Sequence, residues 1–161
     1  MRIVVCVKHV PDMQSERRFE GGRLVRGEDD VLNELDENAI EAAVQLKESE
    51  EDAGREAEVV ALTMGPEDAE DSLMRALQMG ADRAYIVSDE FLEGSDVITT
   101  ASVLSVAIAR ISEECGPVDL VITGMASLDA MTSMLPAALA AKAHMPLLGL
   151  ARSLSVEDGA V

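Results

Sequence analysis

Short apolar runs rich in β-branched residues alternate along this chain with segments of helical periodicity, and this alternation limits the fold to few possibilities. The runs begin at residue 2 and recur at 58–63, 83–87 and 118–123. Strands that are joined through helices pair in parallel, and right-handed crossovers place the helices on both faces of the sheet. We therefore predict an α/β fold with a doubly wound, mostly parallel sheet.

The helical segments have recognisable starts and ends. The first begins near Asn33 or Asp36, either of which suits a helix N-cap. The second follows Pro66, which is favoured in a first helical turn, and ends at Gly80. The third runs from about residue 95 to 114 and is so apolar that we expect it to be deeply buried. The last is expected at roughly 131–143.

The remaining segments are connections and an extra strand. Residues 9–32 contain a proline, glycines and charges, and they predict a long connection with a short edge strand at 23–26. Residues 147–156 predict one more strand, followed by a turn at 156–160. The length of 161 residues predicts a single domain over residues 1–161.

Composition excludes several classes of partner. The net charge of −18 argues against nucleic acid and anionic membrane surfaces, because phosphates would be repelled. With 48% hydrophobic but only 2% aromatic residues, the core must be aliphatic. Cys6 and Cys115 are too few for a disulfide framework and predict free thiols in a reducing cytoplasm. The sequence predicts neither a signal peptide nor a transmembrane segment.

Common enzyme motifs are missing from the sequence. It contains no Gly-rich loop ending in Gly-Lys-Ser/Thr, no Gly-x-Gly-x-x-Gly after the first strand, and no nucleophile elbow. The two histidines, His9 and His144, are too few and too far from the cysteines to indicate a metal cluster. We expect no catalytic residues of the chain's own.

Loops at the carboxyl ends of the strands are the candidate binding site. If strand 118–123 lies beside the first strand, the loops after Lys8 and after Thr123 flank one crevice. Backbone N–H groups of the helix after Asp129 could then hold a phosphate. Hydroxyl donors could come from Ser127, Thr132 and Ser133.

Simpler roles for the same residues remain open. Asp129 could cap its helix, and Met64 could fill the core. Lys8 could pair with an acidic neighbour or with a phosphate.

Four segments resemble a known family over essentially the whole chain. They are residues 5–12 (VCVKHVPD), 33–43 (NELDENAIEAA), 63–66 (TMGP) and 75–84 (RALQMGADRA). On these segments the chain is similar to the β subunit of electron-transfer flavoproteins. The family's fold is akin to that of adenine-nucleotide α-hydrolases and universal stress proteins.

The resemblance implies an electron-transport function without catalytic residues. Family β subunits form heterodimers with an α subunit that carries most of the FAD site, and they accept electrons from acyl-CoA or other flavin dehydrogenases. The β subunit holds a structural AMP or, in electron-bifurcating members, a second FAD. The resemblance places adenine and ribose near Cys6, Asn33 to Asp36 and Met64, and the phosphate over the loop from Gly124 onward.

Departures from the family pattern fall in that loop. Asp129 and Thr132 match, but Ala126 replaces the usual Gln and Ala130 the usual Gly. Further departures are Met131, Met134 and Pro136. Added Cβ atoms and thioethers remove donors and hinder close backbone approach, so we expect adenylate binding to be weakened, altered or lost.

A second departure is length, because family members continue well beyond this point. We therefore expect the family's C-terminal region to be absent. Beside the electron-transfer subunit, two alternative functions remain open for the chain. One is a stand-alone adenine-nucleotide-binding domain of the universal-stress type. The other is a scaffold subunit that has lost its nucleotide.

Overall fold

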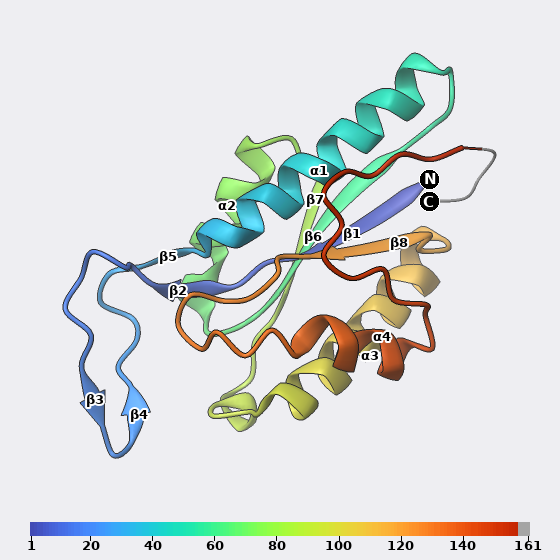
Figure 1. The fold of residues 1–161 in the computed structure, drawn as a ribbon. Coiled ribbons are helices and arrows are strands. Elements are labelled where there is room, and N and C mark those ends of the chain that lie inside the picture. The colour runs from blue at the N-terminus through green and yellow to red at the C-terminus, as the bar shows by residue number, and fades with distance from the viewer. Residues whose placement is uncertain (158–161) are drawn as a thin grey trace.

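The core of the molecule is a four-stranded parallel sheet (Figure 1). A computed structural model describes residues 1–157, with strand order β7-β6-β1-β8. The strands are β1 (Arg2–Cys6), β6 (Glu58–Met64), β7 (Arg83–Val87) and β8 (Leu120–Thr123). The predicted parallel α/β sheet is confirmed, and the strand at 83–87 has the expected bounds.

The chain places β6 and β7 on one side of β1 and β8 on the other side. β1 pairs in parallel with β6 on one side and with β8 on the other, so that Cys6 lies opposite Leu62 and Thr123. This arrangement confirms the predicted neighbourhood of the first and fourth long strands. The loops after β1 and β8 therefore leave the sheet at a topological switch point, where α/β folds usually bind ligands.

Helices cover both faces of the sheet, as predicted (Figure 1). They are α1 (Glu34–Asp52), α2 (Glu70–Gln78), α3 (Val97–Cys115) and α4 (Leu135–Ala143), with short 3₁₀ turns η1 (Glu67–Ala69) and η2 (Glu90–Leu92). Successive side chains of β1 point to opposite faces. Ile3 and Val5 pack in one core with α1 and α2, whereas Val4 and Cys6 pack in a second core with α3 and α4.

The predicted long connection is more ordered than expected. Its ends, β2 (His9–Pro11) and β5 (Asp30–Leu32), pair antiparallel. Beyond them β3 (Phe19–Glu20) and β4 (Arg23–Leu24) form a hairpin that projects from the body (Figure 1). The predicted edge strand at 23–26 is thus present as β4, but it pairs within this hairpin. We call residues 12–29 the arm.

The prediction of deep burial for the third helix is wrong. Asp96 caps α3 by accepting the N–H of Thr99 at 2.7 Å, which agrees with the expected start. However, the helix buries only one face, through Leu104 and Ile108 among others, and the Val106 side chain on the outer face is 69% exposed. Apolar composition did not distinguish a helix buried all round from one that lies on a sheet.

Two predictions near the C-terminus are also wrong. The last helix begins at Leu135 rather than 131, because Met131 and Ser133 adopt left-handed backbone conformations with φ of 52° and 51°. Residues 147–156 form no strand and run irregularly over the surface. The predicted turn at 156–160 lies mostly outside the described residues.

Membrane-spanning helices and metal clusters are both absent from residues 1–157. No helix there is long and apolar enough to cross a membrane. No group of three or more His, Cys, Asp or Glu side chains in this range could hold a metal ion. Both cysteines are free: Cys6 is buried in β1, and the Cys115 Sγ lies 3.2 Å from the Tyr85 hydroxyl.

The two faces of α3 give a matched stability test. Replacing the buried Leu104 with Ala (L104A) should lower the free energy of unfolding by about 2–5 kcal/mol, since it leaves a cavity in the core. The substitution V106A, half a turn away on the exposed face, should change it by less than about 0.5 kcal/mol. Urea denaturation measures both, and equal effects would contradict the assigned orientation of the helix.

Candidate functional site

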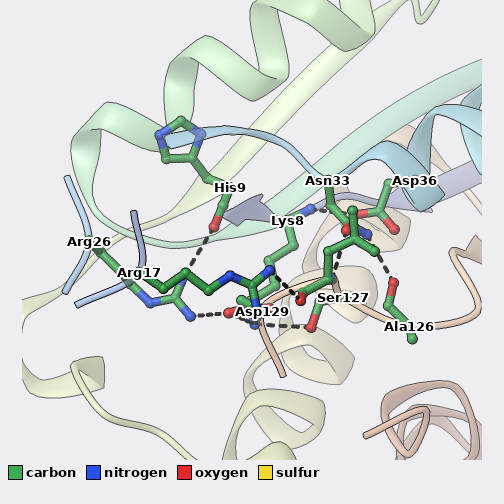
Figure 2. A network of polar contacts seen from close by, with 10 residues as sticks. Lys8, His9, Arg17, Arg26, Asn33, Asp36, Ala126, Ser127 and Asp129 are labelled. Carbon is green, nitrogen blue, oxygen red and sulfur yellow. Dashed lines mark hydrogen bonds and ion pairs between the residues drawn. The ribbon is translucent and has the colours of Figure 1, made fainter. Parts of the chain in front are cut away.

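Lys8 joins the two loops that leave the switch point (Figure 2). Its ammonium Nζ donates hydrogen bonds to both carboxylate oxygens of Asp129, at 2.9 and 3.0 Å, and to the Ser127 hydroxyl at 3.3 Å. Lys8 follows β1, whereas Ser127 and Asp129 follow β8. Because these strands are parallel neighbours, their carboxyl ends bring the three side chains together.

Asp129 is the acceptor at the centre of this contact. Its carboxylate is only 1% exposed, and it is paired with both Lys8 and the guanidinium of Arg26. Burial alone would raise its pKa, but hydrogen bonds from Arg26, Lys8 and Ser127 outweigh that effect and lower the pKa to about 2. Asp129 is therefore ionised at neutral pH. The alternative that it caps a helix is wrong, since α4 begins six residues later.

Asn33 fixes the loop after β8 through two side-chain hydrogen bonds. The fully buried side chain donates from Nδ2 to the Ala126 carbonyl at 3.0 Å and accepts the Leu128 N–H at Oδ1, also at 3.0 Å. Asn33 occupies the N-cap position of α1, yet its side chain makes no cap hydrogen bond. Both polar atoms of the buried side-chain amide instead bond to the loop, which satisfies the need of buried polar groups for partners.

Asp36 lies in the first turn of α1 and connects both strand ends. It accepts the Lys8 backbone N–H at 2.8 Å, and Gly124 packs against it. Burial raises the pKa of Asp36 to about 6, although hydrogen bonds from Asn33, Lys8 and Gly124 partly offset that effect. Burial, together with the charge of Asp36, raises the pKa of the Cys6 thiol to about 12, so this thiol stays protonated.

The arm supplies two basic side chains that the sequence analysis missed. Arg26 pairs with Asp129 and also donates to the His9 carbonyl at 3.4 Å. Arg17 donates to the Leu128 carbonyl at 3.1 Å. The available signal was charge: the chain has 13 basic against 31 acidic residues, and these two arginines lie in a segment that was treated as a mere connection.

The remaining predicted site residues lie outside this network. Met64 ends β6, is half-buried and packs with the core beneath α3, which agrees with the core-filling alternative. Thr132 and Ser133 are exposed, and among residues 1–157 their hydroxyls make no hydrogen bond. The structure thus brings together seven of the predicted residues, which are Cys6, Lys8, Asn33, Asp36, Gly124, Ser127 and Asp129.

The segment between Asp129 and α4 has features that fit a phosphate. Left-handed backbone at Met131 and Ser133 is costly for residues with side chains, and such strain is typical of functional loops. Within the described part of the chain, the N–H groups of residues 132–134 have no acceptor. Alternating left- and right-handed residues form concavities of N–H groups that bind anions. The residues present therefore offer N–H donors of the kind that hold an anion such as phosphate.

The fold and site define a doubly wound α/β protein with a network of polar and charged side chains at the switch point. Residues 22–161 match the family described as "Electron transfer flavoprotein domain". The chain belongs to this family.

Relatives agree with the family match. The chain is 39% identical to "Electron transfer flavoprotein subunit beta" of Mycobacterium leprae over 99% of its own length and 59% of the relative's. The protein of the same name from Megasphaera elsdenii is 36% identical, over 100% and 60%. The "Caffeyl-CoA reductase-Etf complex subunit CarD" of Acetobacterium woodii is 36% identical, over 98% and 58%. The chain spans about three fifths of each relative.

The raised pKa of Asp36 predicts a specific pH dependence. Between its ordinary value of 3.8 and about 6, the folded protein holds a proton that the unfolded chain has lost. The contribution of Asp36 to stability should therefore fall as pH rises through this window. Denaturation of the wild type and of D36N at pH 4, 5, 6 and 7 should show the wild type losing stability relative to the variant. A difference that stays constant would contradict the assignment.

Close packing at Gly124 predicts that any side chain there is harmful. A Cβ atom would overlap the Asp36 carboxylate and approach the Leu35 carbonyl to 3.1 Å. G124A should lower the free energy of unfolding by about 1–3 kcal/mol, since both strand ends must shift. The control is G149A, where a Cβ meets nothing within 4 Å. Thermal denaturation that gives the same Tm for both variants would refute this account.

Proposed function

We propose that this chain acts as an electron-transfer flavoprotein β-type subunit, which works with an α-type partner and holds a nucleotide at the switch point. The observation that carries the proposal is the family match over residues 22–161, because it spans α1 and the loop after β8, which supply Asn33, Asp36, Ser127 and Asp129 to the site. Electron transfer itself would depend on flavin held with the partner. The described side chains would serve to bind and orient rather than to react.

The site supports the nucleotide part of this proposal. The phosphate of AMP, or of a second FAD, would lie over residues 130–134, with Lys8 at its edge. Cys6 and Met64 would face the adenine side of the crevice. Asn33 and Asp36 would act indirectly, because their polar atoms already hold the loop and the strand ends.

A subunit without nucleotide is the second candidate function. It is favoured by one observation: Lys8 and Arg26 already donate to Asp129, which neutralises part of their charge. In that case Asp129 would supply internally the negative charge that a phosphate supplies in other proteins.

Identification of the bound nucleotide tests the two candidates. The chain is purified without added ligand and denatured, and the released small molecules are analysed by mass spectrometry. AMP or FAD supports the proposal and specifies the cofactor. If neither is released, and added AMP does not bind, the second candidate replaces the first. Coexpression with the α subunit of a relative, followed by gel filtration, tests partner formation separately.

The altered loop predicts that AMP affinity can be improved. The double variant A130G/M134Q should bind AMP more tightly than the wild type, because it restores backbone access and a polar side chain. M74Q on α2 is the control, since Met74 is exposed to the same degree as Met134, 54% against 53%. Isothermal titration calorimetry measures both, and unchanged affinity in the double variant would count against this explanation.

A further inference from the structure

Three basic side chains from separate parts of the chain meet at one short loop. Lys8 comes from the end of β1, and Arg17 and Arg26 come from the two sides of the arm. Lys8 and Arg26 contact Asp129, and Arg17 contacts the adjoining Leu128 carbonyl. Figure 2 shows Arg17, Arg26 and Lys8 directed toward the same loop.

The charges in this cluster do not balance. Lys8 and Arg26 pair with the Asp129 carboxylate, whereas Arg17 contacts the adjoining Leu128 carbonyl and lines a hollow beside the arm together with Glu16, Glu28 and Asp29. Arg17 forms no ion pair with any of residues 1–157, since its contact is with a neutral carbonyl. Most of the molecule is strongly acidic, with a net charge of −18. A guanidinium that has no carboxylate partner is available to attract an anion.

The cations also remain open to solvent. The side chains of Lys8 and Arg26 are 40% and 38% exposed, although the carboxylate between them is buried. A guanidinium has five N–H donors, and Arg26 uses only two of its nitrogens, one on Asp129 and one on the His9 carbonyl. Donors are therefore available for an incoming anion without breaking the contact with Asp129.

We propose that the arm forms part of the anion site, with Arg17 and Arg26 binding the phosphate of the nucleotide and the bound phosphate holding the arm against the loop after β8. This inference rests on the proposed function for the identity of the ligand. It extends that function, because it makes the arm and the loop after β8 two halves of one site.

A purely structural role for the arginines would have different consequences. If Arg26 only fastened the arm to Asp129, its loss would destabilise the arm and alter all ligands equally. If it binds phosphate, its loss weakens the binding of a phosphorylated ligand and spares the unphosphorylated one. Adenosine and AMP differ by that group alone, so the pair separates the two roles.

Calorimetric titration with AMP and with adenosine tests the inference on the wild type, R17Q and R26Q. The control is R18Q, since Arg18 lies in the same arm but pairs with Glu28 of the arm itself. We expect R17Q and R26Q each to weaken AMP binding by about tenfold, because hydrogen bonds between charged partners are strong. Adenosine binding should be unchanged, and R18Q should match the wild type.

Limited trypsin digestion gives a second readout of the same site. The arm contains four arginines, at 17, 18, 23 and 26, and each is a potential cleavage site. AMP should slow cleavage within the arm of the wild type and of R18Q but not of R26Q. Adenosine should give no protection.

The outcomes separate this inference from the proposed function. Equal AMP affinity in all four proteins would place the arm outside the site and overturn the inference, while nucleotide binding would stand. Equal loss of AMP and adenosine binding in R26Q would show a fastening role and also overturn it. A wild type that binds neither ligand would overturn the inference and the nucleotide part of the proposed function together.

Discussion

The buried carboxylate of Asp36 is the interaction on which the arrangement of the switch point depends. It lies in the first turn of α1 and accepts the backbone N–H of Lys8, while Gly124 packs against it from the neighbouring loop. One side chain thus sets where β1 and β8 release their loops. A carboxylate in this position costs free energy at neutral pH, as its raised pKa indicates, and the protein tolerates that cost for a fixed geometry.

Because the strand ends are fixed in this way, the opposite charges of Asp129, Lys8 and Arg26 can lie within contact distance. Asn33 hydrogen-bonds the loop after β8, and this loop carries Asp129. Asp129 in turn forms ion pairs with Lys8 and Arg26. This series of contacts runs from the buried, neutral side chain of Asn33 to the partly exposed cations Lys8 and Arg26. The position of the charged groups therefore depends on the uncharged side-chain amide of Asn33, which fixes the loop that carries Asp129.

The parallel α/β class and most strands could be predicted from the sequence, because period and turn residues are local properties. Among the site residues, Lys8, Ser127 and Asp129 could also be placed, since the topology alone brings their loops together. The roles of Arg17 and Arg26 could not, because the path of the arm depends on long-range contacts. The start of α4 was missed for a related reason: left-handed backbone at Met131 and Ser133 is unfavourable locally and leaves no trace in composition.

The exposed apolar face of α3 affects how copies of the protein behave together in solution. Val106 and Ile98 present hydrophobic surface, yet every copy carries a net charge of −18. Mutual repulsion between copies opposes contact through that face while the ionic strength is low. At about 1 M salt the screening length falls to about 3 Å, and the apolar attraction then acts with little electrostatic opposition. Colloidal stability of this chain is thus an electrostatic property, conferred by the net negative charge of the whole molecule.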